Sequence, residues 1–247
     1  YLILHHIYPI VHLLSLILFH AKAVFEKTFS LKRKMKLQSL IGDNILDVKD
    51  VPEDFPLSKR QRLQVDIAQS GKTDIDKTAI RRRLKRLKYP LYFLDYETFA
   101  YVFPAQVGYR PYQQMVFQYS LHILAEPGAE LEHHGYVLQE KEESVEVLIE
   151  HLRQYLLEDD GSVIVWSDNF EMSRNKEMGK RYPKHTAFMK DINDRTFDLM
   201  DLFQENLYVS PKFKGSYSIK KVLPVLCPDL DYSSLEINNG GLATLSW

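Results

Sequence analysis

The segment that most constrains the fold is a run of four apolar residues followed by two acids. The apolar run, residues 91–94, comes directly after Pro90 and predicts a strand that is buried on both faces. Asp95 and Glu97 follow at the end of that strand, with one residue between them. Because side chains two positions apart on a strand point to the same face, the two carboxyl groups are expected to project together, while Tyr96 points to the other face.

Two carboxylates on one edge of a strand repel each other unless a cation lies between them. Hard cations take oxygen ligands, so Asp95 and Glu97 predict a site for Mg²⁺ or Mn²⁺. Two such ions, roughly 3.5–4 Å apart, can serve phosphoryl hydrolysis. The alternative is that the acids only mark the place where the chain leaves the core for solvent. The spacing alone does not separate these two interpretations.

Composition limits the class of protein. The chain has 247 residues, of which 45% are hydrophobic and 26% are charged, as expected for one large globular domain with an appendage. The net charge of −1 provides no overall attraction for nucleic acid, so any basic surface must be local. The single Cys227 excludes an internal disulfide and any multi-cysteine metal site, which is typical of a reducing, cytoplasmic compartment.

The chain divides by pattern into three segments: an apolar leader (1–34), a helical segment (35–88) and an α/β domain (89–247). The leader is close to the length of a membrane span, but histidines and a proline interrupt it. It can be an anchor, the tail of a preceding domain, or translated upstream sequence with Met35 as the true start. We favour the last two, so membrane contact is not expected.

The helical segment is expected to hold two helices, at about 58–69 and 76–88. The second has apolar residues on one face and basic residues around the rest. Such a helix can follow a phosphate backbone or can be a solvated surface. Both interpretations stay open.

The α/β domain begins with three predicted strands and continues with a helix, a strand and another helix. After the strand that carries the acids, alternation predicts strands at 116–124 and 133–138. A helix is expected at 142–158, then a central strand at 163–166 and a helix after residue 167. The order βββαβα is that of a ribonuclease-H-like fold, an α/β architecture whose mixed sheet is flanked by helices.

Other acids are candidates for the same site. In this fold the first and fourth strands lie side by side, so an acid just beyond the fourth strand can face Asp95 and Glu97. Glu171 is the best candidate, and Asp168 is either a rival or a helix cap. Asp198 is either a supporting acid or the N-cap of an apolar helix that follows it.

Two further groups of residues are candidates for binding nucleic acid. Arg110, Tyr112 and Gln113, with their neighbour Tyr109, could stack on a base or contact the backbone, or could simply cover a sheet edge. Ser216 and Lys220, at the start of a helix over 219–226, could hold a phosphate or form a plain turn with a serine cap.

Several motifs together resemble a bacterial domain family of unassigned function that is placed among the DEDD-type (DnaQ-like), ribonuclease-H-like 3′–5′ exonucleases. The resemblance covers roughly residues 36–247. It rests on Leu94-Asp95-Tyr96-Glu97-Thr98, Arg110-Pro111-Tyr112-Gln113-Gln114, Phe117-Gln118-Tyr119-Ser120-Leu121-His122, Asn169-Phe170-Glu171, Arg195 with Asp198-Leu199, Gly215-Ser216-Tyr217-Ser218-Ile219-Lys220 and Val222-Leu223-Pro224.

The resemblance implies a metal-dependent nuclease with a two-metal site for Mg²⁺ or Mn²⁺ and no small-molecule cofactor. Asp95 and Glu97 would be ligands, and Glu171 would stand where such exonucleases more commonly carry Asp. Those enzymes have a last acid shortly after a Tyr or His, and no such pattern precedes Trp247. We therefore expect a fragment without its final helix, in which a second ion binds weakly. The alternatives are a catalytically incomplete nucleic-acid-binding module of the same fold and, if the leader spans a membrane, a structural protein.

Overall fold

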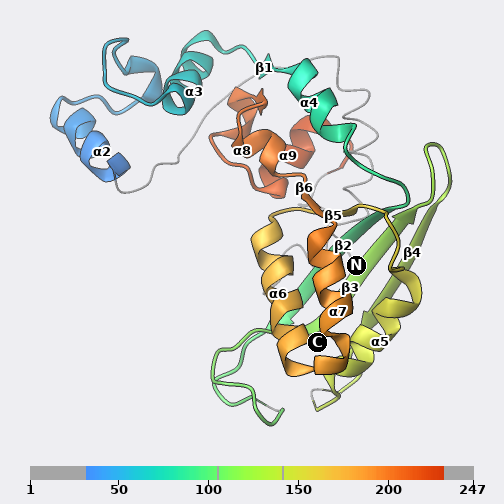
Figure 1. Ribbon diagram of the computed structural model, residues 1–247. Coiled ribbons are helices and arrows are strands. Elements are labelled where there is room, and N and C mark those ends of the chain that lie inside the picture. Colours follow the sequence, from blue (N-terminus) through green and yellow to red (C-terminus); the bar gives the residue numbers. More distant parts are fainter. Residues whose placement is uncertain (1–31, 105, 141, 231–247) are drawn as a thin grey trace. The chain divides into compact units, whose positions relative to one another are not determined.

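The computed structural model describes residues 32–104, 106–140 and 142–230 (Figure 1). The predicted leader therefore lies outside the described residues, except for its last three positions. Contacts between Cα atoms divide the described chain into two units. The first unit is residues 85–199, and the second combines residues 32–84 with residues 200–230. Each unit is described by itself.

The first unit is built on a five-stranded mixed sheet in the order β4-β3-β2-β5-β6. The central strand β2 is antiparallel to β3, and β3 is antiparallel to β4. β5 is parallel to β2, and β6 is parallel to β5. The predicted α/β architecture, a mixed sheet flanked by helices, is confirmed, and the first predicted strand lies beside the fourth. The strands are β2 (Leu91–Phe99), β3 (Met115–Leu124), β4 (Leu131–Val137), β5 (Val163–Val165) and β6 (Thr196–Asp198).

Three helices cover one face of this sheet (Figure 1): α5 (Val145–Tyr155), α6 (Asp168–Arg181) and α7 (Thr186–Asp194). The core between sheet and helices contains Tyr92, Leu94 and Tyr96 of β2. In α5, the valine, leucines and isoleucine of its helical stripe are buried against the sheet, which explains why this helix is readable from the sequence.

The strand β2 continues past the acids, contrary to the expectation that they end it. Glu97 pairs with Gln118 of β3, and after a β-bulge Thr98 pairs with Val116. The pairing with β3 satisfies the backbone groups of this stretch, so the strand persists through polar residues. The acids thus lie on a rigid element and not on a chain that is leaving the core.

Ion pairs and hydrogen bonds of Arg195 connect the start of β6 to the loop before β5. Its guanidinium pairs with Asp191 at 2.6 Å and with Asp159 at 3.0 Å. It also donates to the carbonyl oxygens of Leu157 and Gly161, both at 2.7 Å. The parallel strands β5 and β6 are therefore held in register by one partly buried cation.

The second unit is mainly helical. Ser58 and Gln61 form a capping box at the start of α3, and Gly71 ends that helix with a positive φ of 67°. The helix expected at 76–88 ends at Leu84, four residues early. Its elements are α2 (Lys32–Gly42), η2 (Val48–Asp50), α3 (Lys59–Ser70), β1 (Asp74–Ile75), α4 (Lys77–Leu84), α8 (Asp201–Gln204), β7 (Tyr208–Val209), η4 (Pro211–Phe213) and α9 (Ile219–Leu226).

A short antiparallel pair ties the two chain segments of this unit together. Asp74 of β1 pairs with Val209 of β7, and Ile75 pairs with Tyr208. The C-terminal residues 200–230 therefore group with the N-terminal helices.

Among the described helices, none combines the length and the apolar character that crossing a bilayer requires. The stretch at residues 1–25, which the sequence singles out as the candidate span, is outside the described residues.

Candidate functional site

The predicted acids gather where β5 ends. Ile164 of β5 pairs with Phe93 of β2, so the last residue of β5, Val165, is level with Leu94. At the level of Asp95, β5 has therefore ended, and the segment that leads into α6 takes its place beside β2. Glu171 lies in the first turn of that helix.

Asp95 and Glu97 share one sheet face. Alternation along β2 places them opposite the face whose residues Tyr92, Leu94 and Tyr96 enter the core. Tyr96 itself donates a hydrogen bond to Asn175 of α6 at 2.8 Å. Burial, and then the charge of Glu97, raise the pKa of Asp95 to about 7. The charge of Glu97 is thus close enough to oppose the ionisation of Asp95.

Glu171 is the most strongly perturbed acid of the group. Glu171 is only 4% exposed to solvent, and its Oε2 atom has no hydrogen-bond partner. Burial, and then the charge of Asp95, raise its pKa to about 9, with smaller contributions from Asp198 and Asp168. A buried carboxyl oxygen without a partner is costly in free energy, and such atoms in native proteins often mark a site for an ion or a ligand.

Asp198 holds the start of α6. Its Oδ1 accepts a hydrogen bond from the backbone N–H of Ser167 at 2.9 Å, and its Oδ2 accepts one from Asp168 at 3.0 Å. The alternative that Asp198 caps the helix that follows it is wrong, because Asp198 is the last residue of β6 and the N-cap residue of α8 is Met200. Ser167 adopts a positive φ of 79° and gives α6 no side-chain cap. The carboxylate from β6 replaces that cap and fixes the turn that carries Glu171.

The donor atoms of these acids suit a hard divalent cation, and the unpartnered oxygen of Glu171 offers one free ligand. Their arrangement is open, however. Over residues 32–104, 106–140 and 142–230, no group of three or more histidine, cysteine, aspartate or glutamate side chains is placed to hold a metal ion. The charges of neighbouring acids raise the pKa values of Asp95 and Glu171, but the carboxyl groups do not converge on one point.

The loop between β2 and β3 carries the first set of residues predicted to bind nucleic acid. Arg110 is exposed, and Tyr112 is 69% exposed with a positive φ of 59°. The side chain of Gln113 is used within the turn, where its Oε1 accepts a hydrogen bond from the backbone of Arg110 at 3.1 Å. Tyr109 is covered on one face by Arg181, whose Cζ lies 3.8 Å from the ring centroid.

The same loop holds an aromatic residue that sequence reasoning did not select. Phe103 is 88% exposed, next to Val102 and Pro104. An apolar pair inside a predicted loop was the available signal, because loops seldom keep large apolar side chains without a reason.

Ser216 and Lys220 belong to the second unit, whereas the acids belong to the first. The hydroxyl of Ser216 accepts a hydrogen bond from the backbone of Ser218 at 3.2 Å. Ser218 is the N-cap residue of α9, and Lys220 is exposed in its first turn. The predicted phosphate site thus has the geometry of a turn that leads into a helix.

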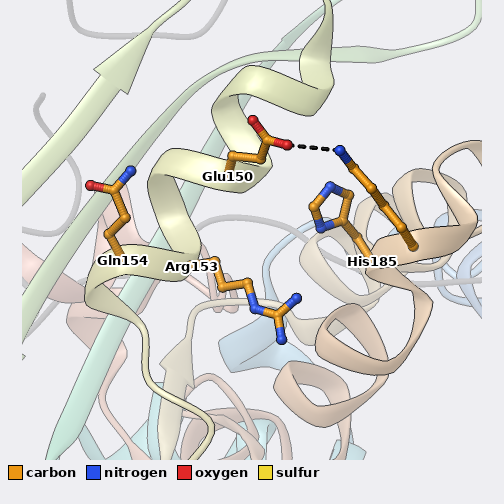
Figure 2. Close-up of a pocket in the computed structure, with 5 residues that line it drawn as sticks. Glu150, Arg153, Gln154 and His185 are labelled. Carbon is orange, nitrogen blue, oxygen red and sulfur yellow. Dashed lines mark hydrogen bonds and ion pairs between the residues drawn. The ribbon is translucent and has the colours of Figure 1, made fainter.

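A shallow hollow of about 440 Å³ lies between α5 and the short helix η3 (Pro183–His185). Figure 2 shows Glu150 and Arg153 of α5 facing His185, while Gln154 points away. Lys184 pairs with Glu150 at 2.8 Å and with Glu146 at 3.2 Å. These charges neutralise one another, and no predicted site residue lines the hollow.

Comparisons with known proteins relate this chain to proteins without an assigned activity. Part of it is 36% identical, over 95 residues, to "Uncharacterized protein UU173" of Ureaplasma parvum serovar 3; the match covers 32% of this chain and 14% of that protein. No solved structure matches. Residues 92–218, just over half of the chain, match the family described as "Domain of unknown function (DUF2779)". They include Asp95, Glu97, Glu171 and Asp198, and the chain belongs to this family.

Proposed function

We propose that the chain is a metal-dependent nuclease that hydrolyses phosphodiester bonds of DNA or RNA, of the 3′–5′ exonuclease type. The site would be formed by Asp95, Glu97 and Glu171 with Mg²⁺ or Mn²⁺, and the setting would be the cytoplasm. The proposal needs no small-molecule cofactor. It rests on the acids of the first unit and on their position at the end of β5.

The observation that carries the proposal is the coupling of Glu171 to Asp95. The charge of Asp95 raises the pKa of Glu171, and one oxygen of Glu171 is buried without a hydrogen-bond partner. Acids that are held together against their own repulsion lower the stability of a protein, so a ligand that relieves the repulsion is expected. A divalent cation is the simplest such ligand.

Each residue has a definite part in this proposal. Asp95 and Glu97 project from one face of a paired strand, which fixes the separation of their carboxyl groups. Asp198 holds the first turn of α6 and thereby sets the position of Glu171. When bound, divalent cations would activate water and stabilise the leaving oxygen of the phosphodiester.

A second candidate is a nucleic-acid-binding module of the same fold without catalysis. It is favoured by the open arrangement of the acids, since no three metal-binding side chains in the described part of the chain converge. In that case, Arg110 and the neighbouring aromatic residues would provide the function, and hydrolysis would be absent.

Metal binding and hydrolysis separate the two candidates. Mn²⁺ is expected to raise the melting temperature of the 247-residue chain, because a ligand that binds only the folded state stabilises it. Asp95→Asn should abolish this shift and also any Mn²⁺-dependent cleavage of labelled DNA or RNA. Asp160→Asn is the control, since its side chain is 91% exposed at a surface ion pair. An equal shift in Asp95→Asn would refute the metal site, whereas a shift without cleavage would favour the binding module.

A further inference from the structure

The loop over residues 100–114 is held in a defined shape by the end of α6. The guanidinium of Arg181 stacks on the ring of Tyr109 and donates a hydrogen bond to the carbonyl of Val107. Gly108 has a positive φ of 84°, and a side chain added there would meet Arg181 Nη1 at 3.3 Å. The base of the loop is closed by a hydrogen bond from the N–H of Tyr112 to the carbonyl of Tyr101, at 2.8 Å.

This anchored loop presents apolar side chains to solvent. Phe103 and Tyr112 are mostly exposed, and Val107 is 94% exposed. A single exposed apolar residue needs no explanation, but several on one short, well-anchored loop are typical of a surface that binds a partner.

The chemistry of the loop favours one kind of partner. Two exposed rings offer flat π-faces, and bases stack on such faces in a way that tolerates any sequence. Arg110, also exposed, is the one charged residue of residues 100–114, and its guanidinium suits a phosphate. The loop directly follows β2, the β-strand that carries Asp95 and Glu97.

We infer that Phe103 and Tyr112 form a stacking platform for unpaired bases of a nucleic-acid strand, with Arg110 contacting its backbone. Bases in a duplex already stack on their neighbours, so this platform selects single-stranded nucleic acid or a frayed end. The inference deepens the proposed function by placing its substrate, but it concerns binding and not hydrolysis.

The test measures binding of the 247-residue chain to a fluorescein-labelled oligothymidylate by anisotropy, in EDTA. Phe103→Ala and Tyr112→Ala are each expected to weaken binding about tenfold, the loss expected for one stacked base. Phe103→Tyr should restore binding, because it keeps the ring. Arg110→Ala should reduce the slope of log affinity against log salt concentration by about 1. A duplex of the same length should bind more weakly than the single strand.

Val107→Ala is the matched control, since Val107 is as exposed as Phe103 but has no ring. An equal loss in Val107→Ala would overturn the platform, because it would indicate a general apolar contact. Absence of oligonucleotide binding, or binding that Phe103→Ala leaves unchanged, would also overturn it, as would loop-dependent binding to phosphatidylcholine vesicles.

Measuring binding in EDTA keeps the two proposals apart, because stacking of bases on the platform needs no divalent cation. Platform binding without a metal response in the wild-type chain would refute only the nuclease. A metal response and cleavage without the platform effect would refute only the platform.

Discussion

Replacing Glu171 by Gln is expected to stabilise the metal-free chain at alkaline pH. The pKa of Glu171 is raised from an ordinary value of 4.5 to about 9, so between these values the folded chain keeps a proton that the unfolded chain has released. A raised pKa of this kind supports folding fully below the unfolded pKa, and that support is lost as pH rises toward the folded pKa. The free energy of unfolding therefore falls by about 1.4 kcal/mol per pH unit in this window.

The interval from pH 7 to pH 8.5 isolates this effect. Over 1.5 pH units, Glu171 alone should lower the free energy of unfolding by about 2 kcal/mol, or the melting temperature by roughly 4–8 °C for a chain of this size. Asp95, whose pKa is about 7, contributes little above that pH. The pKa values of His151 and His185 are lowered, mainly by burial, so these imidazoles are neutral throughout.

The assay is thermal unfolding followed by circular dichroism in EDTA at the two pH values. Glu171→Gln should remove most of the pH slope and melt above the wild type at pH 8.5, whereas the exposed control Asp160→Asn should keep the wild-type slope. If Glu171→Gln kept the full slope, or melted below the wild type at pH 8.5, the carboxyl group would not be held against its own ionisation.

Two further substitutions test the supports of the site. Asp198→Ala should lower the free energy of unfolding in urea by about 2 kcal/mol, because two backbone N–H groups at the start of α6 lose their acceptor. An unchanged midpoint of urea unfolding would contradict this role of Asp198. Arg195→Ala should lower the free energy of unfolding by about 3–5 kcal/mol, since Asp159 and Asp191 lose their shared partner. Arg195→Lys should recover only part of this loss, and full recovery would show that the bidentate geometry is unimportant.

Much of the fold was readable because its elements carry local patterns. The apolar run of β5 and the helical stripe of α5 both lie where the sequence predicts them. The strand β6 was not predicted, because three residues are too few for a period, and its strand conformation comes from pairing with β5. The length of β2 was also missed, since the pairing of its second half with β3 is not visible in the local pattern.

The site was readable in part for the same reason. The spacing of Asp95 and Glu97 is local, so their common face could be predicted from alternation. The role of Asp198 could not, because its hydrogen bonds reach residues 31 and 30 positions away in the chain. The exposure of Phe103 was missed although it lies in a predicted loop, since the same residue type usually enters a core.

The helix α6 fixes the distance between the acids and the loop over residues 100–114. Its first turn carries Glu171 beside the acids, and its last residue, Arg181, clamps the loop that carries the exposed rings. Arg181 lies ten positions beyond Glu171, so at 1.5 Å per residue the two are about 15 Å apart along the helix axis. If a bound strand keeps the 3.4 Å rise per nucleotide of stacked duplex DNA, about four nucleotides match this helix length. On the proposed function, shorter oligonucleotides would occupy one end or the other, so cleavage should fall abruptly below that length while longer substrates behave alike.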